Sequence, residues 1–481
     1  MAEKMLQFTK VSRAMPAKRP PVERASDFGE IYAGYTPEAA EAQASRCSQC
    51  GVPFCQQGCP LQNNIPDWLK LAAEGRMEEA WRVSSATNNM PEICGRICPQ
   101  DRLCEGICTI EQSGHGTVTI GSIEKHITDT AWAEGWVQPI KPMRERAQSA
   151  GIIGAGPAGL AAAEQLRRKG YQVTVYDAYD RGGGLLIYGI PGFKLEKDVV
   201  ERRIKWLEDS GITFRFNTRI GVDRSLSELR AEHDTVLIAT GVYAAKDLKC
   251  PGSGADGVFA ALEYLTASNR VGLGDVVEEY ESGALNAAGK RIVVIGGGDT
   301  AMDCVRTAIR QGAKSVTCVY RRDRANMPGS QREVQNAEEE GVVFEWLANP
   351  ESILDTKAGK VKAVRASRMK LGEPDASGRQ APVKTGETFD LKADMVIKAL
   401  GFDPEDLPAL FNEPALTVNR WGAVRIDYAT MMTSLPGVYA AGDIVRGASL
   451  VVWAIKDGRD AAEAMHKAMK AADAAAKVAA E

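Results

Sequence analysis

Eight of the eleven cysteines lie between Cys47 and Cys108, in two groups of four. The groups read Cys47-x2-Cys50-x4-Cys55-x3-Cys59 and Cys94-x3-Cys98-x5-Cys104-x3-Cys108. Thiolates at such short spacing are ligands for iron–sulfur clusters or for zinc. Proline follows Cys59 and Cys98 directly, as in ferredoxin-type runs, in which the last cysteine of a run can ligate the other cluster. This clustering favours metal or cluster ligation over disulfides.

A first glycine motif follows the apolar strand AGII. Gly154, Gly156 and Gly159 form G-x-G-x-x-G, in which the glycines permit a tight turn, close approach of a pyrophosphate, and close helix–strand packing. Asp177 stands about twenty residues on, at the end of YQVTVYD, where an acid holds a ribose hydroxyl. Because a carboxylate there would repel a 2′-phosphate, we predict that this site binds FAD or NAD(H) and not NADPH.

Three features further along favour FAD over NAD(H) at the first site. The run from Arg181 to Leu185, which contains Gly184, leaves backbone room beside a bulky ring system, an Ala-Thr-Gly turn contains Thr240 and Gly241, and Gly442-Asp443 follows the strand VYAA. The combination resembles flavoproteins with two dinucleotide-binding domains, in which the C-terminal Gly-Asp holds the ribityl–phosphate region. That resemblance implies a discontinuous FAD domain with the second nucleotide unit inserted in it.

A second glycine motif follows the strand RIVVI. Gly296, Gly298 and Ala301 form G-x-G-x-x-A, with Asp299 and Thr300 opening the helix. The next strand, SVTCVY, ends in Arg321-Arg322 where the first unit has an acid. Guanidinium groups match a 2′-phosphate in charge and geometry, so this unit is predicted to bind NADPH. The alternative is a solvated basic loop that includes Arg324.

Other residues receive weaker predictions. Lys314 and Arg332 are expected to be surface charges. The stretch Tyr188–Lys194, with Lys194 as a cofactor contact, and the segment Leu450–Trp453 are expected to line the flavin pocket, although ordinary core packing is the alternative. No acid–base residue is assigned as catalytic, since hydride transfer mainly requires correct stacking of two cofactors.

Two units of strand, glycine turn, helix and strand must position these residues, and each implies a parallel sheet covered by helices. The expected fold class is α/β, with two Rossmann-like dinucleotide-binding domains, one inserted in the other, behind a mainly helical iron–sulfur domain. The predicted boundaries are 1–148 for the helical domain, 149–254 with 400–481 for the FAD domain, and 255–399 for the NADPH domain.

Smaller elements can also be assigned along the 481 residues. IPDWLKLAAEGRMEEAWRVSSATNNMP predicts two short helices between the cysteine groups. Residues from about Glu345 to Val396 predict a small antiparallel appendage. The end of the chain predicts one more strand and a long alanine-rich helix, with a frayed tail from Ala471.

Composition excludes several functions. The formal net charge of −4 does not suggest a nucleic-acid or membrane surface. No uninterrupted apolar run reaches 18 residues, so no transmembrane helix is predicted. The first ten residues carry charges and do not form a signal peptide, so a cytoplasmic location is expected.

Nearly the whole chain resembles the small subunit of glutamate synthase, through both cysteine groups and the strings GAGPAGL, GGGLLIYGIPGFKL, GGGDTAMD, VYRR, MPGS, GFDP and AAGD. The cysteine block is similar, more distantly, to the N-terminal region of dihydropyrimidine dehydrogenase. That resemblance implies one cluster on Cys47, Cys50, Cys55 and Cys108. A second would use Cys59, Cys98 and Cys104, completed by Cys94 or by Glu124. On sequence alone Glu124 is expected to be a solvated helix residue, and Cys94 a buried free thiol if Glu124 is the ligand.

The resemblance also implies a function. Electrons would pass from NADPH to FAD, then through two 4Fe-4S clusters to a large α subunit that carries an iron–sulfur cluster and FMN. That subunit would make glutamate from glutamine and 2-oxoglutarate, and a higher-order αβ oligomer is expected. A flavin belongs between a hydride donor and one-electron clusters, which disfavours the alternative of two redox-inert zinc sites.

Three other functions share some of these motifs. An NADPH–ferredoxin oxidoreductase subunit of an electron-bifurcating complex would share almost all these motifs. A disulfide reductase lacks its Cys-x-x-Cys beside the flavin, and a pyrimidine-reducing enzyme needs a further barrel domain.

Overall fold

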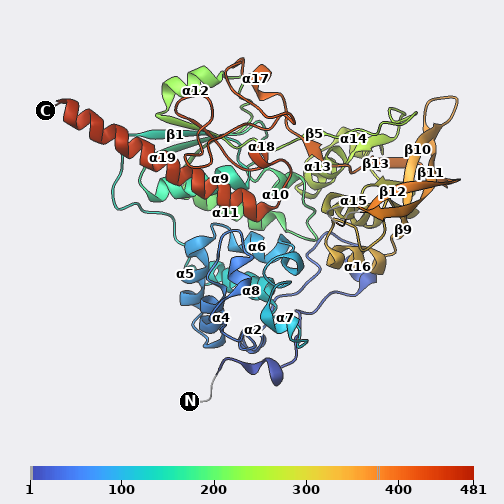
Figure 1. The fold of residues 1–481 in the computed structure, drawn as a ribbon, viewed down its shortest axis with the longest axis horizontal. Helices are drawn as coiled ribbons and strands as arrows, with labels where there is room; N and C mark the ends of the chain where they lie inside the picture. The colour runs from blue at the N-terminus through green and yellow to red at the C-terminus, as the bar shows by residue number, and fades with distance from the viewer. Residues whose placement is uncertain (1–3, 376–377, 379, 481) are drawn as a thin grey trace.

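The computed structural model describes residues 4–375, 378 and 380–480. Three bodies surround a common centre (Figure 1): a helical N-terminal body and two halves built on separate sheets. We call the two sheet-containing parts the first and the second nucleotide half. None of the described helices is long and apolar enough to cross a membrane.

The N-terminal body contains no strand within its described residues. Its elements are η1 Gln7–Thr9, α1 Pro21–Arg24, α2 Pro37–Ala44, α3 Phe54–Gln57, α4 Ile65–Ala73, α5 Met77–Thr87, α6 Pro91–Ile97, η2 Gln100–Arg102, α7 Thr109–Gln112 and α8 Ile120–Ala133. Proline opens α2 and α6, where its missing N–H costs no hydrogen bond. The predicted pair of helices corresponds to α4 and α5, and α4 buries Trp68 and Leu69 against Ile123 of α8.

The first nucleotide half is a parallel five-stranded sheet in the order β15-β4-β1-β2-β3. Its strands are β1 Ser149–Ile153, β2 Gln172–Tyr176, β3 Thr213–Arg215, β4 Thr235–Ile238 and β15 Val438–Ala440. Its helices are α9 Pro157–Arg168, α10 Leu185–Tyr188, α11 Lys197–Asp209, α12 Leu226–Glu232, α17 Leu407–Leu410, α18 Asp443–Arg446 and α19 Val451–Ala480. Helix α19 crosses α9 closely at Gly458, where a Cβ atom would lie 2.1 Å from the carbonyl oxygen of Ala158.

The second nucleotide half is a parallel five-stranded sheet in the order β6-β13-β7-β8-β9. Its strands are β6 Val258–Ala260, β7 Arg291–Ile295, β8 Ser315–Tyr320, β9 Val343–Trp346 and β13 Met395–Lys398, and its helices are α13 Ala261–Gly272, α14 Glu278–Glu281, α15 Asp299–Arg310 and α16 Gln331–Glu339. Its strands lie, in sequence, between β4 and β15 of the first sheet, which confirms the predicted fold class of one nucleotide unit inserted in another. The exact boundaries stay a prediction.

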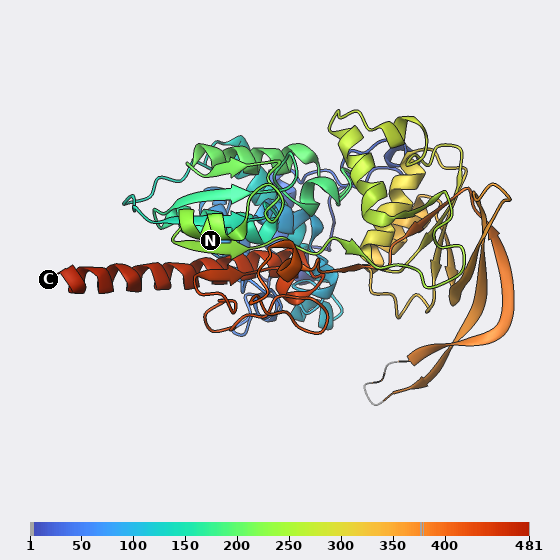
Figure 2. The ribbon, with the colours of Figure 1, turned by 90° about the horizontal axis from the view of Figure 1, so that it is seen from above.

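Two smaller sheets complete the fold. Strands β10 Ala348–Asp355, β11 Val361–Pro374 and β12 Gln380–Lys392 form the expected antiparallel appendage, a curved arm that projects from the second half (Figure 2). Strands β5 Ala244–Ala245 and β14 Phe402–Asp403 pair where the chain crosses between the halves. The expected frayed tail from Ala471 is instead helical over its described part, because α19 continues to Ala480; Glu481 lies outside the described residues. Alanine has the highest helix propensity, and this segment is rich in it.

Candidate functional site

The first glycine motif forms an open cradle at the end of β1. Gly154 has a φ of +110°, and a Cβ atom there would lie 2.3 Å from the carbonyl oxygen of Ala239. A Cβ atom on Gly159 would lie 2.0 Å from the carbonyl oxygen of Gly154. Gly156 differs, since its Cβ position has no atom within 4 Å. The outer two glycines therefore make the turn, and Gly156 leaves the space that a pyrophosphate needs.

Asp177 lies at the end of β2 beside this cradle. Its Oδ2 accepts a hydrogen bond from the Ala155 N–H at 2.7 Å, and its Oδ1 accepts one from the Tyr179 N–H at 2.9 Å. Burial raises the pKa of Asp177, and these two N–H donors oppose that shift. The backbone thus orients a buried carboxylate toward the cavity that it lines.

Two adjoining cavities flank the cradle and share Gly154, Asp177, Thr240 and Tyr243 in their walls; we call them together the flavin-type cavity. One part extends to Tyr179 and Phe411, and the other reaches Leu185, Ala441 and Asp443. The Oγ1 atom of Thr240 is buried without a hydrogen-bond partner. An elongated cavity with an orphaned hydroxyl and a glycine cradle fits a dinucleotide such as FAD.

Gly442 and Asp443 lie opposite the cradle. Gly442 has a φ of +80°, which favours glycine, and opens the short helix α18. Burial raises the pKa of Asp443 to about 6. A buried carboxylate of this kind is stabilised by hydroxyl donors, which the ribityl chain of a flavin carries.

The second glycine motif repeats this geometry beside a separate cavity. Gly296 would place a Cβ atom 2.2 Å from the carbonyl oxygen of Ala399, whereas the Cβ position of Gly298 is open. Asp299 opens α15 and accepts a hydrogen bond from the Ser330 N–H at 2.9 Å, and Ala301 is fully buried. Thr300 lines the cavity beside the motif.

Arg321 and Arg322 line the same cavity, and Nε of Arg322 is buried without a partner. Arg324 is absent from the cavity wall and pairs with Glu338 at 2.9 Å. Two guanidinium groups, one with an unused donor, fit the 2′-phosphate of NADPH. Lys314 is exposed, as expected.

A central cavity lies beside these parts. It shares Ile190, Ser449, Leu450 and Val451 with the flavin-type cavity, and Thr300 with the second nucleotide cavity. It shares Cys98 with a small cavity among the cysteines. Two predicted nucleotide sites and one predicted cluster site therefore adjoin the same cavity.

The central cavity explains where several predicted residues lie. Phe193, Lys194, Leu450 and Val451 line it, and their contact with a flavin stays a prediction. Tyr188 does not, since its hydroxyl donates to Asp180. Lys194 Nζ donates to Asp303 Oδ1 at 2.9 Å, and both side chains border the cavity.

The expectation that Arg332 is a surface charge is wrong. Arg332 lines the central cavity, its Nη2 donates to Gln100 Oε1 at 2.8 Å, and its Nε is buried without a partner. The N-terminal body covers this face of α16. The sequence does not indicate this contact, because Arg332 occupies a polar position of the helix.

The cysteines form two groups in space. Cys47, Cys50, Cys55 and Cys108 lie close enough to interact electrostatically. The small cavity is lined by a different set: Cys59, Cys94, Cys98, Cys104 and Glu124. Burial raises the pKa of the Cys59 thiol to about 11 and that of Cys55 to about 12, so ligation must displace their protons.

Glu124 is buried, so the expectation of a solvated helix glutamate is wrong. Its Oε1 accepts hydrogen bonds from Asn63 Nδ2 at 3.0 Å, Asn88 Nδ2 at 3.1 Å and Ser84 Oγ at 3.4 Å. The described residues supply no cation partner to it. Buried carboxylates are normally paired or coordinate metals, and this one borders a cavity lined by four thiols.

Within the described ranges, no three His, Cys, Asp or Glu side chains are arranged around a single metal ion. Four thiols and the Glu124 carboxylate line one small cavity, and a set of soft sulfur donors of this kind fits a 4Fe-4S cluster.

Sequence reasoning missed several residues that border these cavities. Tyr243 lies in the wall of both parts of the flavin-type cavity, and Ile31 and Tyr32 line the central one. Asn63 and Asn88 hold Glu124. The polar run at Asn88, inside an otherwise helical pattern, is the one signal that sequence offered.

Two family models match the chain. Residues 24–136 match the 4Fe-4S cluster domain II of dihydropyrimidine dehydrogenase, and residues 149–470 match the pyridine nucleotide-disulphide oxidoreductases. The second model spans more than half of the chain.

Curated relatives match over the full length. The chain is 66% identical, over 100% of its own length and 99% of the relative's, to the glutamate synthase (NADPH) small chain of Azospirillum brasilense. It is 45% identical to the glutamate synthase (NADPH) small chain of Escherichia coli, over 96% of this chain and 98% of that one. A solved structure of Mycobacterium tuberculosis FprA in complex with NADPH shares the fold at a TM-score of 0.58 and 22% identity, over 69% of this chain and 86% of that one.

Proposed function

The chain belongs to the glutamate synthase (NADPH) small-chain family of NADPH-dependent flavin and iron–sulfur oxidoreductases, and we propose that it delivers electrons from NADPH to a large glutamate-forming subunit. The large subunit would carry FMN and an iron–sulfur cluster, and would make glutamate from glutamine and 2-oxoglutarate. The observation that carries this proposal is the central cavity, which shares wall residues with both nucleotide cavities and with one thiol-lined cavity.

The proposed FAD contacts lie along the flavin-type cavity and at its junction with the central one. The pyrophosphate of FAD would lie against Gly154, Gly156 and Gly159. Its adenosine ribose would contact Asp177, and its ribityl region would contact Gly442 and Asp443. The remaining proposed FAD contacts are Gly184, Leu185, Lys194, Thr240 and Gly241. A bound flavin supplies the conversion between two-electron hydride chemistry and one-electron transfer.

The proposed NADPH contacts follow the second motif. Gly296, Gly298 and Ala301 let the pyrophosphate approach the start of α15, and Asp299 and Thr300 face the linkage. Arg321 and Arg322 hold the 2′-phosphate. Since Thr300 borders both the NADPH cavity and the central cavity, a bound NADPH would have its nicotinamide end on the side of the central cavity.

We assign one 4Fe-4S cluster to Cys47, Cys50, Cys55 and Cys108. The other takes Cys59, Cys98 and Cys104, with Glu124 as its fourth ligand. Glu124 is preferred over Cys94 because three donors hold its Oε1 while the residue lines the cavity. Cys94 Sγ instead lies 3.8 Å from Asn88 Oδ1, as a buried thiol.

The two cysteine groups are arranged in order from the central cavity. Cys98 separates that cavity from the second group, and Cys104 interacts with Cys55 of the first group. The first group lies nearest the surface, where Val52 is 56% and Phe54 47% exposed. We infer that electrons enter at Cys98 and leave beside the Cys50–Phe54 loop.

The test uses the protein purified anaerobically from its native cells, with whatever accompanies it, and follows NADPH absorbance. NADPH oxidation should accelerate when glutamine and 2-oxoglutarate are added together, glutamate should form, and a large subunit should copurify. If only ferredoxin or dyes accept electrons and a different partner is present, the chain instead serves an electron-bifurcating NADPH–ferredoxin oxidoreductase.

A further inference from the structure

A loop of the N-terminal body, residues 17–33, contacts both nucleotide halves. Its ends pair with each other, since Arg19 N–H donates to the Ile31 carbonyl at 2.9 Å and Ala33 N–H to the Ala17 carbonyl at 2.9 Å. Helix α1 forms its tip. Ile31, Tyr32 and Ala33 line the central cavity, so one edge of the loop is a wall of the proposed reaction space.

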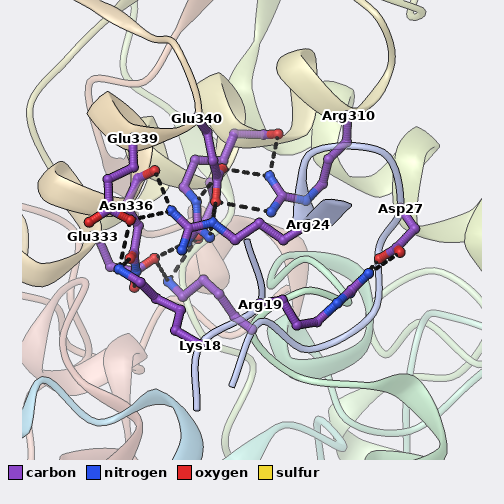
Figure 3. A network of polar contacts seen from close by, with 12 residues as sticks. Lys18, Arg19, Arg24, Asp27, Arg310, Glu333, Asn336, Glu339 and Glu340 are labelled. Atoms are coloured by element: carbon purple, nitrogen blue, oxygen red, sulfur yellow. Dashed lines mark hydrogen bonds and ion pairs between the residues drawn. The ribbon is translucent and has the colours of Figure 1, made fainter. Parts of the chain in front are cut away.

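Arg24, at the end of α1, anchors the loop in the second nucleotide half (Figure 3). Its side chain is fully buried against α16. Nη2 donates to Glu339 Oε2 at 2.6 Å and to the Asn336 carbonyl at 3.3 Å, and Nε lies 3.0 Å from Glu340 Oε1. Lys18 Nζ adds hydrogen bonds to Glu339 Oε2 at 2.7 Å and to Asn336 Oδ1 at 3.2 Å.

The same loop contacts the first nucleotide half and the body that carries the cysteines. Ile31 N–H donates to the Phe193 carbonyl at 3.3 Å, and the rings of Phe28 and Phe193 are 6.3 Å apart. Glu30 pairs with Arg96 of α6 at 2.6 Å and with Lys125 of α8. Residues 17–33 therefore connect all three bodies around the central cavity.

The second half also contacts the first half directly. The chain crosses between them at the short β5–β14 pair. The other contacts between the described residues of the two halves are mostly polar or charged. They include Lys194 with Asp303, Arg181 with Asp275, Arg270 with Asp180, Asn269 Nδ2 with the Tyr188 carbonyl, and the guanidinium groups of Arg306 and Arg310 over the Phe193 ring. Polar interfaces between domains of one chain generally permit relative motion. A third body bound to both halves restricts that motion.

Helix α16 connects the anchor to the cavity. Its C-terminal end holds Arg24, whereas its first turn carries Arg332 and Glu333, which line the central cavity. The preceding loop contacts the second glycine motif, since Gly329 N–H donates to the Gly297 carbonyl at 3.0 Å and Ser330 N–H to Asp299 at 2.9 Å. A shift of α16 would therefore move the proposed nicotinamide side of the cavity.

We propose that Arg24 is a positioning residue for hydride transfer: it binds α16 and thereby holds the second nucleotide half at the distance from the flavin pocket that the reaction requires. The inference rests on the proposed transfer from NADPH to FAD. Misplacement by about 1 Å can slow a well-oriented reaction by about a hundredfold, so a distant anchor suffices to control the rate.

Arg24 can be replaced without leaving a carboxylate unpaired. Glu340 also binds Arg306 at 2.8 Å and Arg310 at 2.7 Å, and Glu339 keeps Lys18. The cluster contains five cations, Lys18, Arg24, Lys194, Arg306 and Arg310, and four carboxylates, Asp303, Glu333, Glu339 and Glu340. The Arg24→Gln variant balances these charges, so we expect it to fold.

The experiment measures anaerobic flavin reduction by saturating NADPH in a stopped-flow instrument, on the complete chain with its cofactors. Arg24→Gln should lower the limiting rate by about tenfold or more, with FAD and iron content unchanged. Hydrogen exchange of residues 331–340 should rise. Arg24→Lys should restore part of the rate, and Arg82→Gln, which removes an exposed ion pair on α5, should change neither readout.

An unchanged limiting rate in folded Arg24→Gln overturns the inference, and so does a fall in thermal stability alone. If Arg24→Gln does not fold, Glu339→Gln weakens the same anchor from α16 and must slow flavin reduction while FAD content stays constant. If the unmodified chain itself does not reduce its flavin with NADPH, the proposed function fails, and the inference about Arg24 fails with it.

Discussion

Asn63 Nδ2 donates a hydrogen bond to Glu124 Oε1 at 3.0 Å, in the wall of a cavity that four thiols also line. An amide that holds one carboxylate oxygen leaves the second oxygen free for a metal, and such supporting hydrogen bonds orient ligands. Cys94, the other candidate ligand, stands in the same wall.

Replacing the two candidates separately distinguishes them. Glu124→Ala should remove or alter one cluster, so that iron content falls from about eight atoms per chain toward about four. Cys94→Ala should keep both clusters, because three cysteines and Glu124 remain. Iron and sulfide analysis with EPR of the reduced protein measures both. Full iron content in Glu124→Ala, with loss in Cys94→Ala, would reverse the assignment.

The glycines of the first motif should separate cofactor binding from folding. Gly156→Ala adds a methyl group to open space, so the cofactor-free chain should keep its melting temperature while FAD content falls. Gly159→Ala places a methyl group 2.0 Å from the Gly154 carbonyl oxygen, which should cost about 1–3 kcal/mol of folding free energy. The flavin-to-protein ratio and thermal unfolding report the two effects, and equal behaviour of both variants would refute this division.

Asp443 should make the cofactor-free chain less stable as pH rises. Its pKa in the folded chain is about 6, against an ordinary value of 3.8, so the folded state binds its proton more tightly than the unfolded state. The resulting stabilisation is complete below pH 3.8 and is lost as pH rises through 6.

Asp443→Asn removes this dependence. At pH 7 the cofactor-free variant should be more stable than the unmodified chain by about 2–3 kcal/mol, yet it should bind FAD more weakly. Denaturant unfolding between pH 4 and pH 8, with FAD titration, gives both quantities. A constant stability difference across this range would contradict the burial of a charged Asp443.

Arg321 and Arg322 should determine the preference for NADPH. Replacing both with serine should lower kcat/KM for NADPH by about a hundredfold or more, because hydrogen bonds to charged groups contribute about 1.5–3 kcal/mol each. The value for NADH should change little. Arg324→Ser is the matched control, since Arg324 binds Glu338 and not the cavity. A comparable loss with Arg324→Ser would place the phosphate elsewhere.

Local patterns predicted the parts of this fold that are determined locally. The glycine motifs, Asp177, and the arginines after SVTCVY follow from the period of strands and turns, and the corresponding strands, turns and side chains occur in the structure. The two cysteine groups were assigned through resemblance, and their spatial grouping is consistent with it. These features depend on short stretches of chain.

Arg332, Glu124 and Arg24 could not be predicted, because each depends on a segment distant in sequence. Arg332 has the pattern of an exposed helix residue, and it is covered through its contact with Gln100 of η2. Glu124 needs Asn63 and Asn88 from two other segments. Arg24 binds residues more than 300 positions away. Charged residues that are buried between domains do not recur at a regular spacing in the sequence, so no sequence pattern indicates them.

The position of β15 at the edge of the first sheet has a consequence for biosynthesis. β4 leaves the ribosome with its edge open, and its partner β15 is translated only after the entire inserted half. At usual rates this interval lasts about 10–40 s. The inserted half can fold during that time, whereas Asp443 and α19, which contribute to the flavin-type cavity, are translated after it. The flavin-type cavity therefore cannot be complete before the inserted half has been made, and nascent chains released before Val438 present an unpaired strand edge prone to aggregation.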